Sequence, residues 1–373
     1  MAKRKANLTA AEAAELEIRA LYEQYGYKKY KMGRFEEYNL YAANMDFITG
    51  DKVLTFTDLD GRLMAFKPDV TLSIIKDTNA NIDSSERLYY IENVCREDRE
   101  GRNFVEIEQM GLEHLGNVDE YGIAEATSLA VKTLRLIDPE YIFEMSHMSF
   151  VMGFLESLRL EIGDYVHFLN LIRRKNAPGI IKVAKKVGLP QKDAEQLAVI
   201  PTLFGPVRQT VRRASKLVKT EAMQSGLDQI LRVYEIMRAM GAGANVQVDL
   251  SLVHDTVYYN GIIFRGFFRQ LGRQVLSGGQ YDEAMKKFGK QCGAIGFGLY
   301  LSELSQMARE KPGNDADVLL LYGKNEDPVK IAKAAASLRK QGLSVMTERT
   351  RPKGMKFGEV ARMKNGELVR KEK

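Results

Sequence analysis

Two long strand-like segments restrict the fold of this chain more than any other feature. They are residues 87–97 (RLYYIENVCRE) and 103–116 (NFVEIEQMGLEHLG), and only the charged loop of residues 98–102 separates them. Parallel strands need a crossover of a dozen or more residues, so strands joined this closely pair antiparallel. Similarly short connections elsewhere predict a mostly antiparallel sheet.

The second of these segments mixes polar and apolar residues on one face. Side chains alternate along a strand, so Val105, Ile107, Gln109, Gly111 and Glu113 share a face. A solvent-exposed strand end would accommodate the two polar groups. If the face is covered, both need partners, because a buried unpaired charge is very costly. The segment is then the floor of a pocket for a ligand with several N–H donors.

Helix and hairpin signals surround this pair of strands. Residues 9–12 have the spacing of a capping box, and the apolar stripe that follows ends at Gly26, which predicts a helix. Residues 53–66 carry two apolar runs around a turn and predict a β-hairpin. Residues 119–136 have helical periodicity.

The second half of the chain changes pattern twice. Residues 150–240 form helical segments punctuated by prolines, and strands return after them, so we expect a helical insertion that interrupts the sheet. The tail has a strand–helix–strand order and an Asn365-Gly366 hairpin turn. We predict an α+β fold with one domain of residues 1–312 and a small α/β unit of residues 313–373.

Composition excludes several classes of protein. Cys95 and Cys292 lie far apart, the four histidines lack metal-ligand spacing, and there is no nucleotide-binding or hydrolase motif, so we expect neither a metal nor a cofactor. No apolar run is long enough to span a membrane, and the start lacks a secretory signal, so a cytoplasmic protein is expected. The net charge of +6 favours polyanionic partners only mildly, and solvated faces are favoured over nucleic-acid binding as the explanation of its basic clusters.

The candidate site consists of polar residues that lie among apolar strand residues. Each has an ordinary explanation: Asp69 could cap a helix, Arg96 could pair with Glu92 or Glu106, and tyrosines could be core aromatics. Together, two carboxylates, an arginine, an amide and several hydroxyls make an amino-acid pocket, because a carboxylate and a tyrosine can hold an imidazole while another carboxylate and an amide hold an ammonium. The set is Asp69, Thr71, Arg96, Gln109, Glu113, Tyr258, Tyr259 and Tyr281.

These residues lie in segments that resemble histidyl-tRNA synthetase, a class II aminoacyl-tRNA synthetase. The similar segments occur in the same order as in that family, and the predicted helical insertion falls where the family has one. The resemblance implies a class II antiparallel sheet flanked by helices, with a homodimer core. The segments are FKPDVT, NVCRED, EIEQMGLEHLG, LVHDTVYYNGIIF, SGGQYDEAM and AIGFGLYLSEL.

Departures from the synthetase pattern fall on residues that handle ATP. By resemblance, His254 and Glu303 stand where arginines contact the substrate carboxylate and the ATP phosphates, and Gln280 also replaces an arginine. A carboxylate facing a triphosphate repels it, whereas adenylate formation needs positive groups at the transferring centre. Arg96 of motif 2 is retained. The resemblance therefore implies that the histidine pocket survives without catalytic residues.

This pattern is similar to the regulatory subunits of ATP phosphoribosyltransferase. That family implies a non-catalytic protein that activates a short catalytic subunit in the first step of histidine biosynthesis and takes part in feedback inhibition by histidine. Glu113 and Tyr259 would hold the imidazole, and Asp69, Thr71 and Gln109 the ammonium. Two alternatives stay open: an active histidyl-tRNA synthetase, and an RNA-binding paralogue that uses the basic insertion. tRNA binding is not expected from the favoured interpretation.

Overall fold

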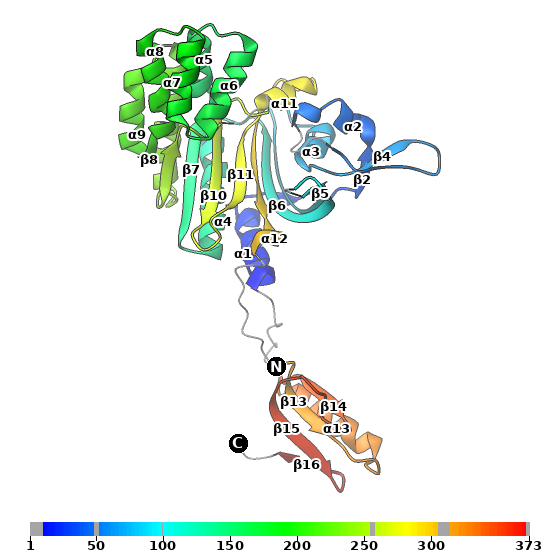
Figure 1. The fold of residues 1–373 in the computed structure, drawn as a ribbon. Coiled ribbons are helices and arrows are strands. Elements are labelled where there is room, and N and C mark those ends of the chain that lie inside the picture. Colours follow the sequence, from blue (N-terminus) through cyan, green and yellow to red (C-terminus); the bar gives the residue numbers. More distant parts are fainter. Residues whose placement is uncertain (1–9, 48–51, 99, 254–257, 305–313, 371–373) are drawn as a thin grey trace. The chain divides into compact units, whose positions relative to one another are not determined.

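The computed structural model describes residues 10–47, 52–98, 100–253, 258–304 and 314–370 (Figure 1). The chain divides into two compact units, one formed by Ala14–Met307 and the other by Ala308–Lys373 with Met1–Ala13. His254 lies outside the described residues, as does Thr9, the first residue of the expected capping box. None of the described helices is long and apolar enough to cross a membrane.

A nine-stranded sheet forms the centre of the larger unit (Figure 1). Its neighbours pair antiparallel except for two parallel pairs, the first with the second strand and the seventh with the eighth. The long hairpin is confirmed, and its register places Glu92 opposite Gln109. The strand order is β1 (Lys28–Lys29), β5 (Ser85–Glu97), β6 (Phe104–Gly116), β12 (Gly293–Tyr300), β11 (Gln274–Gln280), β10 (Ile262–Phe268), β7 (Tyr141–His147), β9 (Val246–Asp249) and β8 (Phe204–Pro206).

The two faces of this sheet belong to two different hydrophobic clusters. Met110 and Leu112 of β6 pack in a cluster that includes residues of α1 (Ala10–Gln24) and α4 (Glu120–Ile137). Ile107 and Leu115, at alternate positions, pack in the second cluster. This alternation confirms the expected two faces of the strand and places Gln109 and Glu113 on the side of the second cluster.

Short elements build the second cluster over the site-bearing face of the sheet. A three-stranded sheet with the order β2-β4-β3 contains the hairpin expected at residues 53–66. The helix α3 begins directly after the loop that follows β4. These elements are β2 (Phe35–Glu37), α2 (Tyr38–Ala42), η1 (Met45–Phe47), β3 (Thr55–Thr57), β4 (Leu63–Phe66), α3 (Thr71–Asp77) and α11 (Asp282–Lys287).

The insertion is helical, as its proline-punctuated sequence indicates. Pro190 and Pro206 directly precede α8 and α9, and Pro178 lies in the first turn of α7, where a missing N–H costs nothing. The strand β8 also lies in this segment and pairs with β9, which the sequence pattern did not predict. The helices are α5 (Met148–Ser157), α6 (Ile162–Arg173), α7 (Ala177–Lys186), α8 (Gln191–Val199), α9 (Val207–Ala214) and α10 (Glu221–Ala239), with the turns η2 (Ile200–Thr202) and η3 (Ser215–Leu217).

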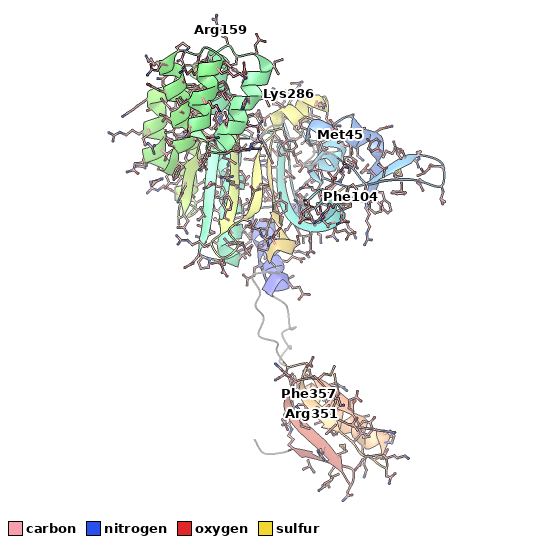
Figure 2. All side chains as sticks on the ribbon, in the orientation of Figure 1. Met45, Phe104, Arg159, Lys286, Arg351 and Phe357 are labelled. Atoms are coloured by element: carbon pink, nitrogen blue, oxygen red, sulfur yellow. The ribbon has the colours of Figure 1, made fainter. Side chains whose placement is uncertain are left out.

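The smaller unit is a four-stranded sheet with one helix against it. Asn365 and Gly366 have φ values of 52° and 82°, as the expected hairpin turn requires. Arg351 lies 6.0 Å from the ring centroid of Phe357, and both are labelled in Figure 2. The sheet order is β14 (Val345–Glu348), β13 (Ala316–Leu321), β15 (Phe357–Lys364) and β16 (Glu367–Arg370), with α13 (Pro328–Lys340) between β13 and β14 in sequence.

Candidate functional site

The polar residues of β6 are covered rather than exposed. Gln109 is 5% exposed and Glu113 is 2% exposed, so the solvent-exposed strand end is the wrong interpretation of this segment. Both carboxylate oxygens of Glu113 are bonded. The hydroxyl of Thr71 donates to Oε1 at 2.7 Å and the hydroxyl of Tyr281 donates to Oε2 at 2.5 Å.

Burial determines the ionisation of Glu113. Loss of solvation raises the pKa of its carboxyl to about 8, and Asp69 adds to this, although the hydrogen bonds from Tyr281 and Thr71 favour the charged form. At pH 7 most molecules therefore carry a protonated Glu113. A neutral imidazole that meets this carboxyl could take its proton and form an imidazolium–carboxylate pair without a net change in bound protons.

Glycine residues on neighbouring strands make room for the side chains of the site. Gly296 of β12 is paired with Glu113, and a Cβ there would lie 1.6 Å from Oε2. Gly111 of β6 is paired with Tyr90, and a Cβ there would lie 2.2 Å from the tyrosine ring. These glycines are thus required by the close approach of Glu113 and Tyr90.

Asp69 and Arg96 form the second part of the site. Asp69 accepts a hydrogen bond from the backbone N–H of Leu72 at 2.9 Å, so it also caps α3 as the ordinary explanation proposed. Arg96 lies 3.6 Å from Asp69 and donates to the carbonyl of Pro68 at 2.7 Å. Burial raises the pKa of Asp69, and the guanidinium of Arg96 opposes this rise.

Arg96 does not pair with the carboxylates considered from the sequence. Glu92 instead forms an ion pair with Lys67, and both side chains are largely buried, at 13% and 4% exposed. Glu106 accepts a hydrogen bond from Asn93 at 3.2 Å. The buried Lys67–Glu92 pair fastens the loop that carries Asp69 to the strand β5.

Three tyrosines pack together beside Glu113. The ring centroid of Tyr258 lies 4.6 Å from that of Tyr259 and 5.4 Å from that of Tyr281. Burial raises the pKa of each hydroxyl, and the charge of Glu113 adds to the effect, so all three are protonated at neutral pH. They are hydrogen-bond donors and acceptors in a largely apolar setting.

The structure brings the eight expected residues to one face of the sheet, and it adds Tyr90. Contacts link Thr71, Glu113 and the three tyrosines, and a separate contact links Asp69 with Arg96; Gln109 lies on the same strand face as Glu113. Tyr90 is 3% exposed. It is paired with Gly111, which lies between Gln109 and Glu113 on β6. The alternation of residues 87–97, which puts Tyr90 and Arg96 on one face, could have found it.

Glu303 lies at the end of β12, in the short helix α12 (Leu301–Leu304). Its carboxylate forms an ion pair with Arg273. The helix expected to continue beyond Leu304 falls outside the described residues.

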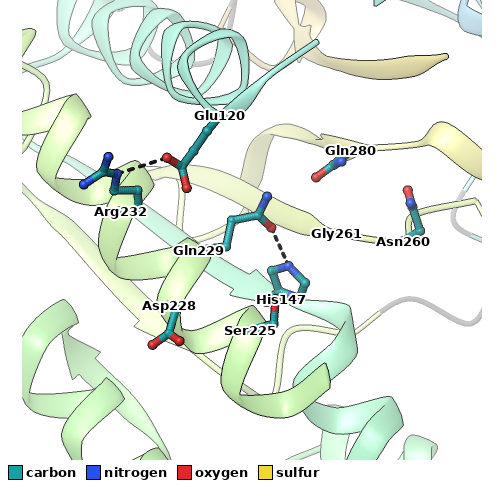
Figure 3. Close-up of a pocket in the computed structure, with 9 residues that line it drawn as sticks. All are labelled: Glu120, His147, Ser225, Asp228, Gln229, Arg232, Asn260, Gly261 and Gln280. Atoms are coloured by element: carbon teal, nitrogen blue, oxygen red, sulfur yellow. Dashed lines mark hydrogen bonds and ion pairs between the residues drawn. The ribbon is translucent and has the colours of Figure 1, made fainter. Parts of the chain in front are cut away.

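A separate polar hollow lies near the ends of β7, β10 and β11 (Figure 3). Its volume is about 610 Å³. None of the eight expected residues lines it, although Asn260 and Gln280 are the chain neighbours of Tyr259 and Tyr281. The lining residues are Glu120, His147, Ser225, Asp228, Gln229, Arg232, Asn260, Gly261 and Gln280.

Two relatives of the chain carry the same name. A protein named ATP phosphoribosyltransferase regulatory subunit from Thermoanaerobacter sp. (strain X514) is 28% identical over 320 residues, which cover 83% of each chain. One of the same name from Clostridium kluyveri is 28% identical over 338 residues, which cover 87% of this chain and 86% of the relative.

Solved structures with the same fold confirm the class II synthetase-like architecture. An ATP phosphoribosyltransferase regulatory subunit/histidyl-tRNA synthetase from Bacillus halodurans matches with a TM-score of 0.78 at 24% identity, covering 91% of this chain and 88% of that one. Histidyl-tRNA synthetase from Nostoc sp. PCC 7120 matches with a TM-score of 0.74 at 16% identity, covering 95% and 86%.

A chain of an ATP phosphoribosyl transferase complex from Thermotoga maritima shares the fold as well. Its TM-score is 0.62 at 17% identity, and the match covers 78% of this chain and 97% of that one. The family model described as histidyl-tRNA synthetase matches residues 4–304, which is most of the 373-residue chain. The chain therefore belongs to the histidyl-tRNA synthetase family.

Proposed function

We propose that this chain is the non-catalytic regulatory subunit of an ATP phosphoribosyltransferase. It would activate a short catalytic subunit in the first step of histidine biosynthesis and take part in feedback inhibition by histidine. The observation that carries the proposal is the name shared by relatives that match over 83% or more of this chain.

The surroundings of Glu303 support the loss of aminoacylation. By resemblance this residue stands where a synthetase arginine grips the ATP phosphates, and here a carboxylate and Arg273 neutralise each other. A positive group already paired in this way offers little stabilisation to a transferring phosphate. The chain is therefore proposed to bind histidine without activating it.

The proposed histidine site uses the residues gathered around Glu113. Glu113 and Tyr259 hold the imidazole, and Asp69 and Gln109 receive the ammonium. Thr71 donates its only hydrogen to Glu113, which leaves its oxygen to accept from the ammonium. Arg96, Tyr258 and Tyr281 complete the site by holding Asp69 and Glu113 in place.

Feedback follows if histidine binds two states of the assembly with different affinity. Only that difference can shift the equilibrium between an active and an inhibited complex. A homodimer of the class II core, located in the cytoplasm, is part of the same proposal.

The test is to mix the full chain with the short catalytic subunit from the same source. We expect a complex that co-elutes and forms phosphoribosyl-ATP faster than the catalytic subunit alone, with histidine suppressing the gain. Glu113→Gln should keep the complex and the activation but weaken histidine binding at least tenfold in calorimetry. Failure to form a complex or to activate would overturn the proposal.

The same preparation discriminates the RNA-binding alternative. Residues 151–240 contain 15 lysines and arginines against 8 aspartates and glutamates, which is the observation that favours a polyanionic partner. tRNA binding that weakens steeply between 50 and 200 mM salt, together with no activation of the catalytic subunit, would favour that alternative.

A further inference from the structure

The C-terminal ends of two short helices meet at one lysine, Lys290. The helix α3 has seven residues and α11 has six, and helices this short are not stable without outside contacts. Both pack in the second hydrophobic cluster, to which Ile75 of α3 and Met285 of α11 belong (Figure 1). Apolar packing has no directional preference, so polar contacts at the ends of the two helices determine how they lie.

The N-terminal ends of both helices meet at Glu113. Thr71 is the first residue of α3, and Tyr281 directly precedes α11. Their hydroxyls donate to the two carboxylate oxygens of Glu113, at 2.7 Å from Thr71 and 2.5 Å from Tyr281. The relative position of α3 and α11 therefore decides whether both hydroxyls can reach Glu113 at the same time.

Lys290 connects the opposite ends of these helices. Its backbone N–H donates to the carbonyl of Met285 at 3.0 Å, which attaches it to the end of α11. Its ammonium donates to the carbonyls of Ile75 and Thr78, each at 2.5 Å, at the end of α3. In the described part of the chain no other side chain donates to these two carbonyls. A cation at this place also interacts favourably with the C-terminal end of a helix dipole.

We propose that Lys290 is a positioning residue for the imidazole-binding end of the candidate site. It holds together the ends of α3 and α11 that lie away from Glu113, so the two helices present Thr71 and Tyr281 to the carboxylate in a fixed arrangement. The effect on a ligand rests on the histidine site proposed above, whereas the placement of the two hydroxyls does not depend on that proposal.

The first test is Lys290→Met in the full-length chain, which removes the ammonium and keeps a long side chain. We expect the affinity for histidine in calorimetry to fall about tenfold, because binding groups need to be held within about 0.5 Å of their productive positions. Lys290→Arg, which keeps a cation with N–H donors, should recover most of this loss. If Lys290→Met does not fold, Lys290→Gln replaces it, and a loss of the same kind is expected.

Two controls separate positioning from charge and from stability. Lys286→Met removes an exposed cation from α11, labelled in Figure 2, and should leave the affinity for histidine unchanged. Leu129→Ala destabilises the same unit from α4, in the cluster on the other face of the sheet, and should also leave the affinity of the folded chain unchanged. If Leu129→Ala weakens binding as much as Lys290→Met, Lys290 contributes stability alone and the inference is wrong.

The near-ultraviolet circular dichroism of the tyrosines gives a second readout that needs no ligand. The ring centroids of Tyr281 and Tyr258 lie 5.4 Å apart, so a shift of α11 would change this signal. Lys290→Met should change the spectrum and Lys290→Arg should restore it, while Leu129→Ala and Lys286→Met should leave it unchanged. If the unsubstituted chain does not bind histidine and the spectrum still changes in this way, the proposed histidine site fails and the positioning role stands. An unchanged spectrum in Lys290→Met, or an unchanged affinity in a chain that binds histidine, would overturn the inference.

Discussion

At the scale of single residues, Glu113 combines complete burial with a hydrogen bond to each oxygen. The hydroxyls of Thr71 and Tyr281 come from segments far apart in sequence. They meet at Glu113 because α3 packs against the sheet and Tyr281 directly follows β11, which is separated from β6 only by β12. Two hydroxyls do not replace the water that a charged carboxylate loses, so its charged form is costly.

The raised pKa of Glu113 predicts a pH-dependent stability. In the unfolded chain the pKa is near 4.5 and in the folded chain about 8, so between these values the folded state binds more protons. The free energy of unfolding therefore falls as pH rises from about 4.5 through 8. Glu113→Gln removes this loss, and between pH 6 and 8 the substituted chain should gain about 2 kcal/mol relative to the unsubstituted one. Urea unfolding at both pH values measures it. If the free energies of unfolding of the two chains differ by the same amount at pH 6 and at pH 8, Glu113 is charged at both pH values.

Gly296→Ala tests the close approach of Glu113 to β12. The added Cβ would lie 1.6 Å from Glu113 and 2.6 Å from the carbonyl oxygen of Leu112, which cannot move away without disturbing the sheet. We expect a loss of roughly 3 kcal/mol in the free energy of unfolding. Gly163→Ala in α6 is the control, because nothing lies within 4 Å of its Cβ, and it should gain up to about 1 kcal/mol. Equal changes in the free energy of unfolding from the two substitutions would show that Glu113 and Leu112 do not crowd position 296.

At the scale of elements, the loop between β4 and α3 is held against β5 by more than its backbone. The carbonyl of Lys67 accepts from the backbone N–H of Cys95 at 2.8 Å, and its ammonium pairs with Glu92. This short segment presents Asp69 and Thr71 to the site, so its attachment sets the position of both.

Lys67→Met should leave the Glu92 carboxylate buried without its partner. We expect a loss of about 3–5 kcal/mol in stability, and weaker histidine binding because Asp69 and Thr71 lose their support. Adding Glu92→Gln to Lys67→Met should restore much of the stability. A double-mutant cycle by chemical denaturation measures the coupling between the two positions, and strictly additive effects would show that the pair contributes nothing.

The sequence predicted the elements of the sheet better than the partners of its polar residues. Alternation along residues 103–116 was sufficient to place Gln109 and Glu113 on one face, because the strand period is fixed. Which hydroxyls reach Glu113 depends on where α3 packs on the sheet and on the place of β11 in the strand order, and no local pattern encodes either. Lys67 with Glu92, and the strand β8, were missed for the same reason, since both depend on contacts between distant segments.

At the scale of the whole molecule, the chain has two compact units with separate hydrophobic clusters. Val318, Leu320 and Leu338 belong to a cluster formed only by residues of the smaller unit. The hydrophobic residues of one unit can lose their packing while those of the other stay packed. The two units therefore need not unfold in a single transition.

Calorimetry should therefore record two thermal transitions. Leu320→Ala removes a fully buried side chain from β13 and should cost about 2–5 kcal/mol in the smaller unit alone, lowering one transition and leaving the other within error. Leu129→Ala, equally buried in α4, should lower the other transition. A single transition that both substitutions lower together would show that the units unfold cooperatively.

The tyrosine cluster beside Glu113 gives the protein an intrinsic spectroscopic signal. The chain has 17 tyrosines and no tryptophan, so tyrosine dominates its near-ultraviolet absorption and emission. Rings as close as those of Tyr258, Tyr259 and Tyr281 couple their electronic transitions and should give a strong near-ultraviolet circular dichroism signal. A ligand that enters between Glu113 and Tyr259 would change this signal directly. Occupancy of the site can then be followed in solution without a dye, a label or an added chromophore.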